Sequence, residues 1–201
     1  MSSIAVSGAT QELPPPRRAT DPVAPISHYA KQRLECEELV VNSGMDCCVL
    51  RLAPMLPPAL ELRDGASLRG FFANALENRV ELVHPKDAAQ AVARALTCDE
   101  VWGKALLVGG GKACQVRKRD VNRALFRALG LVEFPDAAFG DEEDENDWLD
   151  TQESEELLGY QEMSADDLFA DWQEQAAKTR TRIKWVRPLY QHFLQRHSRM
   201  R

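Results

Sequence analysis

The sequence predicts an α/β fold, in which short buried strands alternate with helices. Two apolar runs, Cys47–Leu50 and Ala105–Val108, have the length and composition of buried strands. A proline loop follows the first run, and glycines follow the second. The length of 201 residues suits one domain with a core, or a domain with an appendage.

The N-terminal part is predicted to contain a short strand, a proline-rich loop and a helix. Ser3–Ser7 is the candidate strand and ends at Gly8. The prolines that follow exclude the interior of a helix or sheet. Ser27 is a candidate N-cap for a helix over His28–Asn42, and Gly44 stands where a glycine cap would end it.

Further helices and strands follow in alternation. We expect a helix near Ser67–Glu77, a short strand at Val80–Val83, and a helix over Asp87–Thr97 that is opened by Pro85. After the strand at Ala105–Val108, later helices are predicted over Val116–Leu129, Thr151–Leu158, Ala165–Ala177 and Ile183–Arg196, with Asp141–Asp147 as a solvated acidic loop. This divides the chain into an α/β region at 1–132, an acidic loop at 133–150 and C-terminal helices at 151–201.

The net charge of −6 is unevenly distributed. Residues 1–127 carry +3, residues 128–177 carry −17 and residues 178–201 carry +8. The acidic block argues against a nucleic-acid binder, because it would repel phosphates beside the basic part. The basic tail at 178–201 is predicted to form an amphipathic helix. Such a helix can bind a membrane or a partner, but we favour packing against the acidic block at 128–177.

Cysteine usage and hydropathy indicate a soluble cytoplasmic protein. The five cysteines are odd in number and form no CxxC motif, which suits a reducing compartment. No apolar run approaches the length of a membrane span, and the N-terminus lacks the features of a secretory signal. No set of His, Cys, Asp and Glu has metal-ligand spacing, so we expect no metal.

The glycine run Gly109–Gly111, followed by Lys112, superficially resembles a phosphate-binding loop. A Walker loop would need Gly where Leu106 stands and Ser or Thr where Ala113 stands, and a GxGxxG motif would need Gly at Cys114. We therefore interpret the run as a turn between a strand and a helix.

Tyr29 and Arg33 share one face of the predicted helix because they are four residues apart. A nearby cation favours the phenolate form of a tyrosine, and Ser3 at the end of a strand is placed to hydrogen-bond both the phenol and a substrate oxygen. Such a set suits proton transfer coupled to hydride transfer. The alternative is an ordinary surface pair.

Several segments, taken in order, resemble the extended short-chain dehydrogenase/reductase family, the NAD-dependent epimerases and dehydratases. The family pattern is a strand ending in Ser-Ser, then Tyr-x-x-x-Lys some 25 residues later, then an acid four residues further on. The segments that resemble the family are Ser2–Gly8, Tyr29–Arg33 with Glu37, Ser43–Arg51, His84–Ala91, Gly103–Gly110 and Leu157–Gln161. The resemblance covers about residues 1–177 and implies a partial Rossmann-like, doubly wound sheet.

Two features depart from the family. The lysine of Tyr-x-x-x-Lys is replaced by Arg33, whose planar head differs from a compact ammonium. The family's first half, with its glycine-rich turn and acidic ribose ligand, has no counterpart, and Met1 is expected to be an internal residue of the family pattern. We therefore expect an open sheet edge that a protein partner or a second copy covers.

The resemblance implies a role for each candidate site residue. Tyr29 is the acid/base, Ser3 orients the substrate, and Arg33 replaces the lysine. Pro54 and Met55 lie near the nicotinamide of NAD or NADP.

Two further residues keep two interpretations each. Arg51 contacts a substrate phosphate or is a strand-end charge. His84 lines the substrate pocket or, as we favour, is a structural histidine at a helix start.

The implied function is hydride transfer at a hydroxyl or carbonyl carbon of a small, sugar-nucleotide-like substrate, impaired in this chain alone. The alternative is a non-catalytic binding or regulatory module with the same fold.

Overall fold

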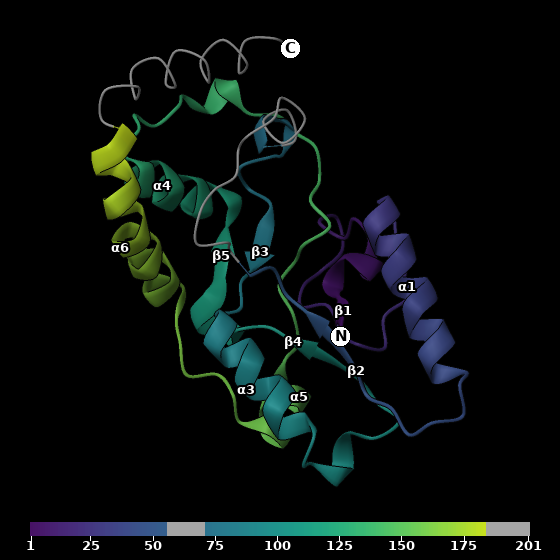
Figure 1. Cartoon of the computed structure of the whole chain (residues 1–201). Coiled ribbons are helices and arrows are strands. Elements are labelled where there is room, and N and C mark those ends of the chain that lie inside the picture. Colours follow the sequence, from purple (N-terminus) through teal and green to yellow (C-terminus); the bar gives the residue numbers. More distant parts are fainter. Residues whose placement is uncertain (56–70, 184–201) are drawn as a thin grey trace. The chain divides into compact units, whose positions relative to one another are not determined.

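The computed structural model describes residues 1–55 and 71–183 (Figure 1). It divides into two compact units, which we describe separately. The first unit comprises residues 1–56, 79–116 and 144–165, and the second comprises 57–78, 117–143 and 166–201. The predicted α/β architecture with a parallel sheet is confirmed.

A parallel sheet organises the first unit. Its strands are β1 (Ser2–Ser3), β2 (Val49–Leu52) and β4 (Ala105–Val108), in the order β1-β2-β4. Ser3 is opposite Leu52, and Leu52 is opposite Val108, so the three strands end at the same level. The near-continuous apolar residues of β4 suit a strand that is covered on both faces.

The first predicted strand is shorter than expected. Only Ser2–Ser3 is extended, and Ile4–Ser7 forms a 3₁₀ helix, η1, so the prediction for residues 4–7 was wrong. The Ser3 hydroxyl accepts a hydrogen bond from the Ala5 amide at 3.2 Å, and this bond caps η1. Gly8 ends η1 with a φ of 75°, as expected of a glycine stop.

Helix α1 (His28–Val41) follows the proline-rich loop and contacts β1 and η1 (Figure 1). The predicted N-cap is confirmed, because the Ser27 hydroxyl accepts from the Ala30 amide at 3.2 Å. The C-cap is Asn42, whose amide donates to the Glu38 carbonyl at 2.9 Å. The predicted glycine cap at Gly44 was therefore wrong, since the helix has already ended when the chain reaches it.

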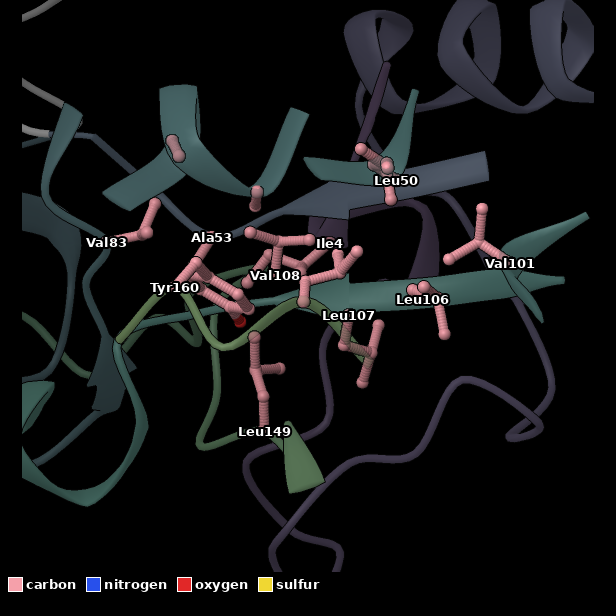
Figure 2. Close-up of a cluster of buried hydrophobic side chains, with 14 residues drawn as sticks. Ile4, Leu50, Ala53, Val83, Val101, Leu106, Leu107, Val108, Leu149 and Tyr160 are labelled. Carbon is pink, nitrogen blue, oxygen red and sulfur yellow. The ribbon is translucent and has the colours of Figure 1, made fainter. Parts of the chain in front are cut away.

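The core of the first unit lies between the sheet and two later helices, α3 (Pro85–Ala95) and α5 (Gln152–Leu158). Figure 2 shows Tyr160 beside Val108 and Leu149 in this core. Helix α5 contacts both α3 and β4, and the Ser154 hydroxyl donates to the Leu107 carbonyl at 2.6 Å. Short 3₁₀ helices, η2 (Asp99–Val101) and η3 (Gly111–Cys114), flank β4.

The second unit has its own aromatic core. Helix α4 (Lys118–Leu129) ends at Gly130, which has a left-handed φ of 66° as the predicted glycine stop requires. The short η4 (Asp136–Ala138) and helix α6 (Ala165–Ile183) also belong here, although Ala165 itself falls in the first unit. The aromatic cluster consists of Phe71, Phe72, Phe126, Phe134 and Phe139.

β3 (Arg79–Glu81) and β5 (Gln115–Arg117) form a two-stranded sheet, of which only β3 was predicted. The predicted helix from Val116 begins at Lys118, because Gln115–Arg117 is extended. Residues 184–196 of the predicted helix at Ile183–Arg196, and residues 67–70 of that near Ser67–Glu77, lie outside the described residues. Residues 71–73 are helical, but Asn74 and Ala75 form β-bridges, so the predicted helix ends before Glu77 and this part of the prediction was wrong. Among the described helices, none is long and apolar enough to cross a membrane.

The end of the predicted acidic loop is not solvated. Asp147 is 2% exposed, accepts from the Thr10 hydroxyl at 2.9 Å, and pairs with the Arg79 guanidinium at 2.6 Å. A buried carboxylate needs such partners, and they come from sequence-distant segments. The expectation of a solvated loop was therefore wrong for Asp147.

Candidate functional site

The carboxyl ends of the parallel strands bring several predicted site residues to one edge of the sheet. Ser3 ends β1 beside Leu52 at the end of β2. Beyond β2, the Pro54 carbonyl accepts from the Val83 amide at 3.2 Å, which places Pro54 next to the segment that contains His84. In open α/β sheets, ligands bind outside this edge.

Tyr29 and Arg33 lie together on α1, as their spacing predicts. Tyr29 is 49% exposed, and the Arg33 guanidinium lies over its ring, 5.1 Å from the centroid. This geometry is a cation–π contact with the ring face. The Ser3 hydroxyl accepts from the Ala5 amide and so keeps its own proton available for a substrate oxygen.

Arg51 is buried and engaged with protein groups. Its Nη2 and Nε atoms lie 2.8 Å and 3.1 Å from the two Glu37 carboxylate oxygens, and Nη1 donates to the Ala19 carbonyl at 3.2 Å. This ion pair joins β2 to α1. The contacts favour a structural role, and a contact with substrate phosphate stays a prediction.

His84 caps a helix, which agrees with the interpretation we favoured. It is 3% exposed, and its Nδ1 accepts from the Lys86 amide at 3.0 Å at the start of α3. On the same turn, burial raises the pKa of the Asp87 carboxyl above its usual range. Met55, predicted to lie near the nicotinamide, is 44% exposed.

The glycine run at 109–111 is a packed turn, as predicted, and one of its hydrogen-bond partners is the buried Glu81. The Gly111 amide donates to Glu81 Oε1 at 3.0 Å. A Cβ at Gly109 would collide with the Glu81 carboxylate, and one at Gly110 with the Cys114 side chain. This close packing explains the glycines without a phosphate.

Glu81 was not singled out by sequence reasoning. It is fully buried and accepts from the Leu149 amide at 2.9 Å and the Gln115 side chain at 2.8 Å, besides Gly111. Burial raises its pKa, although these hydrogen bonds act in the opposite direction. The available signal was an acid inside the apolar segment Val80–Val83.

Tyr160 was included only in the segment Leu157–Gln161 of the family resemblance, without a predicted role. Its hydroxyl donates to the Gly109 carbonyl at 2.8 Å and accepts from the Gly109 amide at 3.2 Å. Burial raises the pKa of this phenol. Tyr160 therefore joins the segment after α5 to the turn after β4, and it supports the site without belonging to it.

No protein-family model matches the sequence, and no curated protein matches it either. Solved structures do match in fold. UDP-glucuronic acid 4-epimerase from Bacillus cereus, in complex with UDP-glucuronic acid and NAD, is 16% identical with a TM-score of 0.67, and the match covers 89% of this chain and 60% of that chain. A short-chain dehydrogenase/reductase superfamily protein from Agrobacterium tumefaciens with bound NAD is 18% identical with a TM-score of 0.65, over 94% of this chain and 68% of that chain.

The dTDP-glucose 4,6-dehydratase from Bacillus anthracis in complex with NAD is 15% identical, with a TM-score of 0.65 over 94% of this chain and 63% of that chain. The chain therefore has the Rossmann-like α/β fold of NAD-dependent short-chain dehydrogenase/reductase structures, and the predicted resemblance is confirmed at the level of the fold. It spans about 60% of the length of the B. cereus epimerase.

Proposed function

We propose that this chain corresponds to the C-terminal part of an NAD(P)-dependent epimerase/dehydratase-like protein. The family chemistry is hydride transfer at a hydroxyl or carbonyl carbon of a sugar-nucleotide-like substrate. The observation that carries the proposal is the position of Ser3 at the carboxyl end of β1, against which α1 with Tyr29 packs. The names of structural neighbours, which include complexes with UDP-glucuronic acid and NAD, support this substrate class.

In this proposal each residue has one task. The Tyr29 hydroxyl exchanges a proton with the substrate hydroxyl, and Ser3 donates its free proton to the same oxygen. Arg33 supplies the positive charge on the helix face of Tyr29. Pro54 and Met55 follow β2 and form the surface for the nicotinamide.

Among residues 1–55 and 71–183, the groups that we propose for the cofactor lie at its nicotinamide end. Tyr29 and Met55 are both about half exposed, so a planar ring can reach them. The glycine run offers no phosphate cradle, because the Gly111 amide is bonded to Glu81 and the space beside Gly110 is filled by Cys114. Dinucleotide phosphates therefore need groups beyond this turn, and we expect the chain alone to be impaired.

A non-catalytic binding module is the second candidate. The favouring observation is that the guanidinium of Arg33 lies over the Tyr29 ring, where the family has a lysine. The open edge of β1 and the exposed Leu39 and Val41 on α1 support a protein partner or a second copy.

Calorimetric titration of the full chain with NAD, NADP and UDP-glucose distinguishes the two candidates, together with turnover measured at high NAD by chromatography of the sugar-nucleotide product. We expect binding of UDP-glucose and slow turnover that Tyr29→Phe lowers about 100-fold or more. Arg33→Lys should raise turnover, because it restores a compact ammonium. Lys31→Ala, on another side of the same helix, is the matched control and should change neither. Absence of nucleotide-sugar binding and of turnover in every variant supports the module instead.

A further inference from the structure

A pocket lies in the first unit, and none of the predicted catalytic residues lines it. Its volume is about 550 Å³, which is within the range of small-molecule sites. Pro15 and Pro16 from the proline-rich loop line it, together with the η3 turn and the segment around Trp148. The pocket is therefore assembled from sequence-distant segments of one compact unit.

The buried carboxylate of Glu81 holds the walls of this pocket in place. It accepts hydrogen bonds from the Gly111 amide, the Leu149 amide and the Gln115 side chain, and all three donors belong to lining residues. A fully buried acceptor with three donors fixes their relative positions. The pocket is thus largely preformed, which lowers the entropic cost of binding.

Three glutamine side chains belong to the lining. The amide nitrogens of Gln115, Gln152 and Gln161 donate to Glu81 Oε2, Glu156 Oε1 and the Gly109 carbonyl at 2.8, 2.8 and 3.0 Å. Each of those partners is only an acceptor, so partner chemistry determines which amide atom is nitrogen. The three oxygens are left as acceptors, since no hydrogen bond to them is recorded in the described part of the chain.

Lys112 adds a cationic donor, and Trp148 adds an apolar surface. The Lys112 ammonium is exposed and has no ion pair or hydrogen bond among the described residues. The indole nitrogen of Trp148 donates to the Val116 carbonyl at 3.2 Å, so the ring itself is what the indole offers to a ligand. The lining therefore combines the Lys112 ammonium, the Thr151 hydroxyl, several acceptors that include the Asp150 carboxylate, and a ring beside two prolines.

We propose that this pocket binds a small cyclic polyol of the monosaccharide class. Hydroxyl groups both donate and accept, so they match glutamine oxygens and a lysine ammonium at the same time. The C–H face of a sugar ring would pack on the indole of Trp148. An organic cation would meet both the Lys112 ammonium and the Asp150 carboxylate, so the charges of the lining do not favour it over a neutral polyol. The proposal is independent of the proposed function, since it uses neither Ser3 nor Tyr29.

Titration of the full ¹⁵N-labelled chain with methyl glucoside tests the proposal, with the indole N–H resonance of Trp148 as the readout. We expect a saturable shift with a dissociation constant on the order of millimolar. Lys112→Ala should weaken binding about three- to tenfold through the loss of a hydrogen bond. The shift of the Thr151 backbone amide measures binding in this variant. Trp148→Ala removes the indole resonance, so its expected loss of binding is measured on the backbone amide of Thr151, with the fold checked on the same spectrum.

Trp102→Ala is the matched control, because Trp102 is 42% exposed in the same unit and does not line the pocket. It should leave the affinity unchanged. A shift that rises linearly without saturation would overturn the proposal, as would equal affinity in Lys112→Ala. Saturable binding of tetramethylammonium in place of methyl glucoside would overturn it in favour of a cation site.

Discussion

Arg51 is a charged residue in the middle strand of the parallel sheet, and its burial depends on Glu37. Both side chains are less than 10% exposed, and their closest atoms are 2.8 Å apart. Removing one partner leaves the other charge buried and unpaired. We expect Glu37→Gln to lower the free energy of unfolding by about 3–5 kcal/mol, measured by urea denaturation.

The double variant Glu37→Leu with Arg51→Met is the control for this prediction. Replacing both charges by apolar groups of similar size removes the unpaired charge, so most of the lost stability should return. If the double variant is as unstable as Glu37→Gln alone, the pair does not act as a unit.

Glu81 makes stability depend on pH. Because burial raises its folded pKa above the unfolded value of 4.5, the native state holds this proton more tightly than the unfolded state. The stabilising contribution is therefore present below pH 4.5 and is lost as the pH rises towards the folded pKa. We expect the free energy of unfolding to fall less steeply in Glu81→Gln than in the wild type over this window, measured by urea denaturation at several pH values.

Asp87 also has a raised pKa from burial, so the wild-type slope contains both groups. The difference in pH slope between the wild type and Glu81→Gln gives the contribution of Glu81. The difference between the wild type and Asp87→Asn gives the contribution of Asp87. Identical pH slopes for the wild type and Glu81→Gln would contradict the assignment.

At the scale of elements, the turn after β4 is packed so closely that no side chain fits at Gly110. A Cβ at Gly110 would meet the Cys114 side chain and the Leu82 carbonyl, and the carbonyl cannot move because it accepts from the Gly110 amide at 2.8 Å. We expect Gly110→Ala to lower the free energy of unfolding by about 1–3 kcal/mol through overpacking. Lys112→Ala, at an exposed position two residues away, should stay within about 0.5 kcal/mol of the wild type.

Elements whose signal is local could be predicted from the sequence. The bounds of β4 are those predicted, and α1, α3 and α4 begin within two residues of the predicted starts. η1 and β5 could not be predicted, because a capping serine and a pairing strand decide them. The burial of Asp147 depends on Arg79 and Thr10, which lie far away in the sequence.

The candidate site shows the same division. The helical spacing of Tyr29 and Arg33 could be predicted. The family resemblance implied a strand that ends at Ser3, whereas the residue pattern extended the strand to Ser7. The cation–π geometry and the engagement of Arg51 with Glu37 could not, because both depend on side-chain packing. The role of Glu81 could not be predicted, because a single acid in an apolar segment forms no spacing pattern with other residues.

At the scale of the whole molecule, apolar surface on α1 predicts association. Leu39 is 73% exposed, Val41 is 56% exposed, and β1 stands at the edge of the sheet. We expect the chain to self-associate as its concentration rises, measured by sedimentation velocity, and Leu39→Lys to reduce this association. Leu96→Lys is the matched control, because Leu96 is also 73% exposed but caps α3. If Leu39→Lys and Leu96→Lys reduce association equally, the association does not depend on α1 and the prediction is contradicted.

The discontinuity of the first unit has a consequence for synthesis on the ribosome. Its three pieces are separated by segments of the second unit, and the last piece ends at residue 165. Tyr160 and Leu149 in the core come from that last piece, while Ile4 comes from the first. The early strands therefore emerge well before their final partners, and the unit completes its fold only after residue 165 has left the exit tunnel.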